Sequence, residues 1–172
     1  MYSIVSCRED SAATGTIATL GLGEAGGALA RDLAAAGAVV RGYDPAVSVP
    51  EGIIATGSEA EVADGADLVL SVNSASAAVD ALEAGIAGLG AGAAWADLNT
   101  ASPGTKRGLA AIAAAHGVPF ADVAIMAPVP SRGLRVPMLA TGSAAGIVAT
   151  ALNAVGARLA HIASRKIVNN RE

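Results

Sequence analysis

The chain has 172 residues, of which 53% are hydrophobic and only 2% aromatic, and its formal net charge is −4. This length suits about one domain, and the acidic balance argues against a general nucleic-acid-binding protein, which normally shows a basic face. The single cysteine, Cys7, excludes an internal disulfide and fits a reducing, cytoplasmic compartment.

Short apolar segments alternate with alanine-rich segments of helical character. We expect strands at 16–20, 38–43, 52–56, 67–72, 93–98, 118–123, 138–141 and 157–162. We expect helices at 24–36, 58–66, 74–89, 102–116 and 143–155, with Ser58 as an N-cap and Pro103 at a first helical position. This alternation predicts the α/β class, as a Rossmann-type, doubly wound and mostly parallel sheet with helices on both faces.

No apolar run reaches the length of a membrane span, so no membrane partner is expected. The first residues include Arg8, Glu9 and Asp10, where a signal peptide needs an apolar stretch. We therefore expect residues 1–15 to be a poorly ordered extension and residues 16–162 to form the domain. The chain has no His/Cys cluster with ligand spacing, so no metal site is expected.

A glycine motif, Gly21-x-Gly23-x-x-Gly26, follows the first strand and opens the first helix. In this context the glycines allow a tight turn, a close backbone approach to a pyrophosphate and close helix–strand packing. The motif predicts a dinucleotide site formed by Gly21, Leu22, Gly23, Glu24, Ala25 and Gly26, with the Glu24 side chain pointing outward. The alternative is a glycine turn that binds no ligand.

An acidic residue, Asp44, ends the second strand 23 residues after Gly21 and is followed by Pro45. A carboxylate at about this spacing binds the adenosine ribose hydroxyls and repels a 2′-phosphate, which favours NAD. Arg41 in the same strand keeps NADP open, and Asp44 could instead simply begin a turn. Val72, Asn73 and Ser74 follow the fourth strand and should line the same cofactor cleft.

Three segments, "GLGEAGGALARDLAAAGAVVRGYDPA", "DLNTASPGTKRGLA" and "FADVAIMAPVPSRG", occur in this order. Together they resemble the NAD-binding domain of the β-hydroxyacid dehydrogenases, a superfamily that includes 6-phosphogluconate dehydrogenase and 3-hydroxyisobutyrate dehydrogenase. The resemblance runs from about residue 16 to the end of the chain. It implies an NAD(P)-dependent dehydrogenase that moves hydride between the cofactor and a small, anionic β-hydroxy acid.

The resemblance also implies substrate-binding positions. Asn99 stands where the family usually has serine, a position that in the family lies near the nicotinamide and the substrate. Thr100 fits the family pattern. Ser131 and Arg132 replace a double glycine in the family's substrate loop, where the guanidinium could hold an anionic group. For Thr100 the alternative is a helix-entry turn with Thr100 and Ser102 as caps, and for Arg132 it is a solvated loop residue.

The family places a catalytic lysine after the NAD-binding domain, with an asparagine four residues later. Lys166 and Asn170 have this spacing, although the glycine-rich approach of the family is missing here. Lys166 would act as general acid–base, and Asn170 would orient the substrate. The alternative is a solvated lysine on a terminal helix.

Family members continue into an all-helical domain that closes over the nicotinamide. We expect residues 163–172 to begin the helix that leads there, the helical domain to be absent, and hydride transfer by this chain alone to be slow or absent. A homodimer or a partner chain could then complete the site. Two alternatives remain: a catalytically incomplete dinucleotide-binding module, and an NADP-dependent reductase related to the imine reductases.

Overall fold

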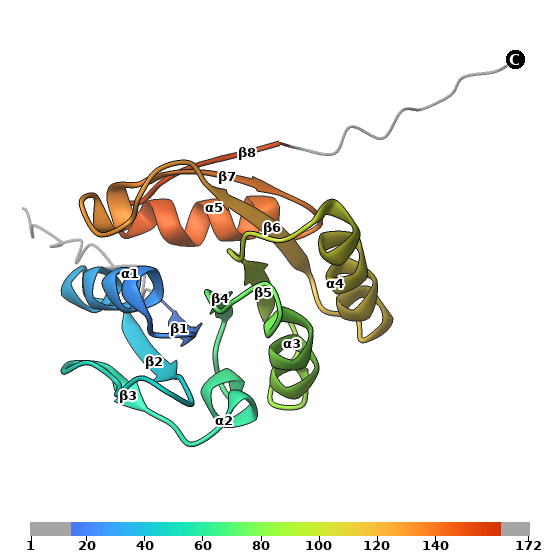
Figure 1. Ribbon diagram of the computed structural model, residues 1–172, viewed down its shortest axis with the longest axis horizontal. Helices are drawn as coiled ribbons and strands as arrows, with labels where there is room; N and C mark the ends of the chain where they lie inside the picture. Colours follow the sequence, from blue (N-terminus) through green and yellow to red (C-terminus); the bar gives the residue numbers. More distant parts are fainter. Residues whose placement is uncertain (1–14, 163–172) are drawn as a thin grey trace, which may run out of the picture.

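The computed structural model describes residues 15–162, in which strands and helices alternate (Figure 1). The strands are β1 (Thr16–Leu20), β2 (Val39–Tyr43), β3 (Ile54–Ala55), β4 (Leu68–Ser71), β5 (Ala94–Asp97), β6 (Phe120–Ile125), β7 (Pro137–Thr141) and β8 (Arg158–His161). The helices are α1 (Glu24–Ala35), α2 (Glu59–Ala63), α3 (Ala78–Ile86), α4 (Pro103–Ala115), α5 (Ala145–Ala154) and the 3₁₀ helix η1 (Gly133–Arg135).

All eight strands form one sheet in the order β3-β2-β1-β4-β5-β6-β7-β8. The strands from β3 to β6 run parallel, β7 pairs antiparallel with β6, and β8 pairs parallel with β7. The expected mostly parallel α/β fold is therefore confirmed. The chain leaves β1 on one side toward β2 and later returns on its other side as β4, and this reversal opens a crevice at the carboxyl ends of these strands.

Successive side chains of a strand point to opposite faces of the sheet. Here both sets are apolar, so both faces of the sheet are buried under helices. In β5, Ala94 and Ala96 pack with α1 and α5, whereas Trp95 packs with α2, α3 and α4. The helices thus form two layers around the sheet (Figure 1). Within residues 15–162 no helix is both long and apolar enough to cross a bilayer.

Two predicted helix starts were too early. The segment after β4 first makes a turn, in which the Ala77 N–H donates to the Ser74 carbonyl, so α3 begins only at Ala78. Ser143 was expected to open the fifth helix, but its hydroxyl accepts a hydrogen bond from the Phe120 N–H at 3.0 Å. Ser143 therefore anchors β6, and α5 begins at Ala145.

The predicted caps of two helices are confirmed. The Ser58 Oγ accepts a hydrogen bond from the Glu61 N–H at 3.2 Å, and the Ser102 Oγ accepts one from the Thr105 N–H at 3.1 Å. Ser102 is followed by Pro103 at the first position of α4. This cap fixes where the chain turns from β5 into α4.

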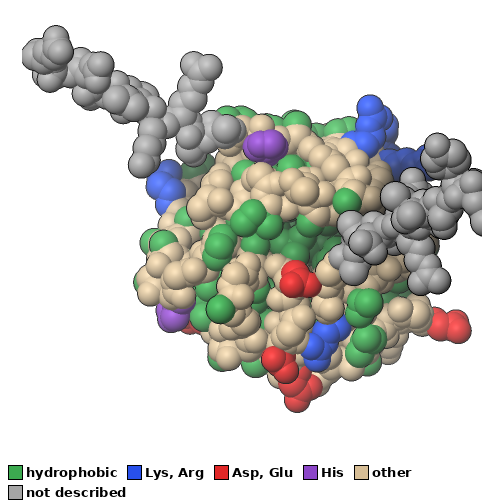
Figure 2. Space-filling view, turned by 180° about the vertical axis from the view of Figure 1, so that it is seen from behind, with side chains coloured by type: hydrophobic (Ala, Val, Ile, Leu, Met, Phe, Trp, Pro, Cys, Tyr) green, Lys and Arg blue, Asp and Glu red, His purple; other side chains and the backbone are tan. Residues whose placement is uncertain are grey.

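The face opposite to that of Figure 1 carries its Lys and Arg side chains in separate places, with hydrophobic side chains across the middle (Figure 2). On this face the described residues gather no broad basic surface. That distribution agrees with the acidic net charge of −4.

Candidate functional site

The loops that follow β1, β2, β4 and β5 meet at the carboxyl edge of the sheet and surround a cleft of about 620 Å³. The predicted cofactor residues that line it are Gly21, Gly23, Glu24, Ala25, Gly26, Asp44, Pro45, Val72, Asn73, Ser74 and Thr100. Asn99 lines the same cleft. Segments far apart in the sequence are thus brought together where ligands of open α/β sheets bind.

The glycine loop is shaped by contacts that leave no room for side chains at two positions. Gly21 has a φ of +86°, and a Cβ there would lie 2.4 Å from the Val72 carbonyl oxygen. A Cβ on Gly26 would lie 1.9 Å from the Gly21 carbonyl oxygen, so this glycine lets α1 pack directly against the loop. Gly23 differs, because no described atom lies within 4 Å of a Cβ built there. The space over Gly23 is therefore open to the cleft.

The N-terminus of α1 points its main-chain donors into this cleft. Gly23 is the N-cap and has no side chain that could accept from the first turn. The first N–H groups of a helix lack partners within the helix, and the helix dipole adds positive potential there. Glu24 is solvent-exposed and also lines the cleft. These residues fit a bound anion such as a pyrophosphate.

Asp44 joins the end of β2 to the glycine loop. Its Oδ2 accepts a hydrogen bond from the Leu22 N–H at 2.7 Å, and its Oδ1 accepts from the N–H groups of Ala46 and Val47 at 2.8 and 3.0 Å. A carboxylate offers about four acceptor positions, so Oδ2 keeps one for a ligand. Leu22 itself is only 3% exposed, and its N–H is already used. Leu22 therefore shapes the loop and does not line the cleft.

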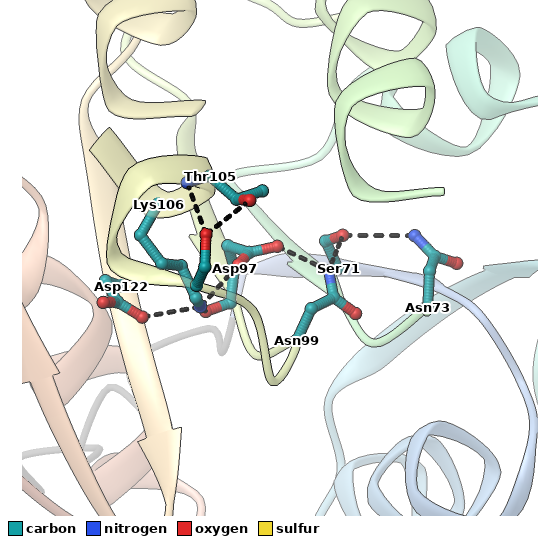
Figure 3. Close-up of polar contacts among 8 residues, drawn as sticks. Ser71, Asn73, Asp97, Asn99, Thr105, Lys106 and Asp122 are labelled. Carbon is teal, nitrogen blue, oxygen red and sulfur yellow. Dashed lines mark hydrogen bonds and ion pairs between the residues drawn. The ribbon is translucent and has the colours of Figure 1, made fainter. Parts of the chain in front are cut away.

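A polar network joins the carboxyl ends of β4 and β5 to Asp122 of β6 (Figure 3). The Lys106 ammonium lies 2.6 Å from Oδ2 of Asp97 and 2.6 Å from Oδ1 of Asp122. The Asn99 Nδ2 donates to Oδ1 of Asp97 at 2.5 Å and to the Ser71 Oγ at 3.1 Å. The Asn73 Nδ2 donates to the same Ser71 oxygen at 3.1 Å. One chain of contacts thus links Asp122 to Asn73.

Lys106 and Asp97 were not among the predicted site residues. The Asp97 side chain is fully buried and that of Lys106 is 11% exposed, so the pair sits beneath the surface of the site. A lysine in the first turn of a helix is opposed by the helix dipole unless carboxylates lie nearby. The position of Lys106 in the first turn of α4 could therefore have predicted a nearby carboxylate.

Asn99 and Thr100 also line a second hollow of about 330 Å³, together with Lys106, Asp122 and Ile125. The two hollows share Leu98, Asn99, Thr100 and Ile125, so they are neighbours. The predicted substrate positions 99 and 100 therefore lie between the glycine loop and this second hollow.

Arg132 lines neither the cleft at the glycine loop nor the second hollow beside Lys106. Arg132 lines a separate hollow with Asp32 and Val155, because the loop runs into η1, and the Leu134 N–H donates to Asp32 of α1 at 2.8 Å. Ser131 lies in the same loop and makes a long 3.5 Å contact to the Pro128 carbonyl oxygen. Lys166 and Asn170 lie outside the described residues. Among residues 15–162, no group of three or more His, Cys, Asp or Glu side chains could hold a metal ion.

Comparison with known proteins places this geometry in a family. The model for the NAD-binding domain of 6-phosphogluconate dehydrogenase matches residues 16–161. Among solved structures, a conserved hypothetical protein from Sinorhizobium meliloti 1021 is 32% identical, with a TM-score of 0.79 over 87% of this chain and 54% of that chain. A comparison with curated proteins found no match.

Two further solved structures carry names. The 3-hydroxyisobutyrate dehydrogenase of Mycobacterium tuberculosis, solved with L-serine, is 25% identical, with a TM-score of 0.76 over 86% of this chain and 54% of that chain. An imine reductase from Myxococcus stipitatus in complex with NADP⁺ is 22% identical, with a TM-score of 0.74 over the same shares, and this likeness shows the fold alone. The chain spans about half the length of these proteins.

Proposed function

Because this chain belongs to the family of the NAD-binding domain of 6-phosphogluconate dehydrogenase, we propose that it is the cofactor half of a dehydrogenase for small β-hydroxy acids. The bound nicotinamide would accept hydride from the hydroxyl-bearing carbon of the substrate. The hydroxyl proton would pass to a base, for which Lys166 is the candidate, and Asn170 would orient the substrate. The protein's part is to hold and orient the reacting groups.

The observation that carries this proposal is the open space over Gly23 beside the unpaired first turn of α1. Main-chain N–H groups there bind the pyrophosphate without any cationic side chain. The free acceptor position of Asp44 binds the adenosine ribose at one end of the cleft. Val72, Asn73, Ser74 and Thr100 line the same cleft, and we assign Thr100 to the part that would hold the nicotinamide.

The arrangement favours NAD over NADP. The Asp44 carboxylate would repel a 2′-phosphate at the ribose. Arg41, the residue that kept NADP open, directs its guanidinium Nη1 to the carbonyl oxygen of Asp64. Arg41 is therefore engaged away from Asp44, and no compensating cation is contributed by β2.

The proposal is tested with the 172-residue chain in two assays. Calorimetric titration should give at least about tenfold tighter binding of NAD than of NADP, which corresponds to about 1.4 kcal/mol. Equal affinities would contradict the cofactor assignment. Turnover is then followed by nicotinamide absorbance over a panel of β-hydroxy acids and cyclic imines. Hydroxy-acid turnover by this chain alone should be slow, and Lys166→Ala should remove it and leave NAD affinity unchanged.

The same assays separate the alternatives. Binding of NAD without turnover of any substrate would favour a dinucleotide-binding module. Turnover of imines alone, with NADPH preferred, would favour a reductase related to the imine reductases.

A further inference from the structure

Asn99 holds a buried acceptor that has no partner. The residue is 5% exposed, and its side-chain oxygen Oδ1 lacks a hydrogen-bond partner among residues 15–162. Both hydrogens of its Nδ2 are used, one by Oδ1 of Asp97 and one by the Ser71 Oγ. Buried polar atoms are nearly always paired in folded proteins, so an orphaned carbonyl oxygen beside a cleft indicates a donor on a ligand.

The orientation of this amide is determined by its neighbours. An ionised carboxylate only accepts hydrogen bonds, so the amide group that faces Asp97 at 2.5 Å must be the NH₂. The other oxygen of Asp97 is occupied by Lys106 at 2.6 Å, which holds the carboxylate in place. The Asn99 oxygen therefore points away from both Asp97 and Ser71 (Figure 3).

The Asn99 side chain is not available to bind a substrate carboxylate. Both N–H groups of Asn99 are committed within the network, so they cannot be donated to a substrate carboxylate. The one polar side-chain atom of Asn99 that lacks a partner is an acceptor. Its partner must therefore be an N–H or O–H group.

The order of the strands identifies the ligand group that reaches this position. Asp44 follows β2, the glycine loop follows β1, Val72 follows β4 and Asn99 follows β5, and these four strands are neighbours in the sheet. Neighbouring strands lie about 4.8 Å apart, so Asp44 and Asn99 mark two ends of a cleft roughly 14 Å apart. A dinucleotide with its adenosine ribose at Asp44 and its pyrophosphate at the loop has its nicotinamide at Asn99.

We propose that the Asn99 Oδ1 accepts a hydrogen bond from the carboxamide NH₂ of the nicotinamide. Asn99 is then a cofactor-orienting residue, held by the Lys106–Asp97 pair, and not a ligand of the substrate carboxylate. This inference rests on the proposed NAD binding. The inference adds that Asn99 distinguishes dinucleotides that carry the carboxamide from those that lack it.

The test uses calorimetric titration of the 172-residue chain with three ligands. NAD carries the carboxamide, 3-acetylpyridine adenine dinucleotide replaces its NH₂ by a methyl group, and ADP-ribose lacks the ring. The unmodified chain should bind NAD about five- to tenfold more tightly than the acetylpyridine analogue, which is the usual effect of one hydrogen bond. In Asn99→Ala this ratio should fall to about one, whereas ADP-ribose affinity should not change.

Asn153→Ala serves as a matched control, because the Asn153 side chain in α5 bonds to the main chain of Leu159 and lines neither hollow of the site. Its NAD-to-analogue ratio should remain that of the unmodified chain. A ratio near one in the unmodified chain, or a ratio unchanged by Asn99→Ala, would overturn the inference while ADP-ribose still binds. Failure of all three ligands to bind the unmodified chain would instead overturn the proposed function itself.

Discussion

The carboxylate of Asp44 accepts a hydrogen bond from the main-chain N–H of Leu22 at 2.7 Å, which ties the end of β2 to the glycine loop. The residue proposed to select the ribose therefore also fixes the loop proposed to hold the pyrophosphate. A similar contact occurs at the opposite end of β1, where Asp67 accepts from the Thr16 N–H at 2.8 Å. The two aspartates make comparable contacts to backbone and differ in their distance from the cleft.

Asp44→Ala should weaken NAD binding about ten- to hundredfold, because it removes ribose hydrogen bonds to a charged group and frees the loop. NADP binding should weaken less than NAD binding, since the charge that repels the 2′-phosphate is gone, so the ratio of NAD to NADP affinity should fall. Titration calorimetry with both cofactors measures the change. Asp67→Ala is the control and should leave the ratio of NAD to NADP affinity as it was. A similar drop in that ratio for both variants would mean that Asp44 acts only through the fold.

Two alanine substitutions in the glycine loop should have different effects. Gly23→Ala places its methyl group in open space, so the free energy of unfolding should stay within about 0.5 kcal/mol while NAD affinity falls. Gly26→Ala forces its methyl group against the Gly21 carbonyl oxygen and should lower the free energy of unfolding by about 1–3 kcal/mol. Urea unfolding and calorimetry separate the two outcomes. Unchanged NAD affinity in Gly23→Ala would place the pyrophosphate elsewhere.

Lys106→Met should lower the free energy of unfolding by about 3–5 kcal/mol, because it leaves the buried Asp97 without its cation. Arg107→Met, at the next and solvent-exposed position of α4, should change it by no more than about 0.5 kcal/mol. The fluorescence of Trp95, which is fully buried, reports unfolding in urea. Equal stability of the two variants would show that the network of Figure 3 is not held by Lys106.

Gly85→Ala tests whether stability and binding can be separated. A Cβ at Gly85 would lie 2.7 Å from the Trp95 ring, on the face covered by α3 and away from the cleft. We expect a loss of about 1–3 kcal/mol in stability and a shifted Trp95 emission, with NAD affinity unchanged. Gly90→Ala, where a Cβ meets no described atom within 4 Å, is the matched control and should behave like the unmodified chain.

Local patterns predicted the parts of this molecule that local contacts build. The glycine loop, the end of β2 at Asp44, and the caps Ser58 and Ser102 follow from residues close together in the sequence. The network from Asp122 to Asn73 depends on β4, β5 and β6 lying side by side, which no single segment reveals. Arg132 is exposed, as the alternative of a solvated loop residue predicted, but the packing of η1 against α1 through Asp32 was not foreseen.

The central claim is that the open main-chain donors at the start of α1 hold the pyrophosphate of NAD. Two-dimensional ¹H–¹⁵N NMR of the labelled chain, titrated with NAD, tests it most directly. The account predicts that the largest amide shifts fall on Gly23, Glu24 and Ala25 and that ADP-ribose reproduces them. Saturable binding that leaves these amides unmoved, with the largest shifts in the hollow around Asp32 and Arg132, would contradict it.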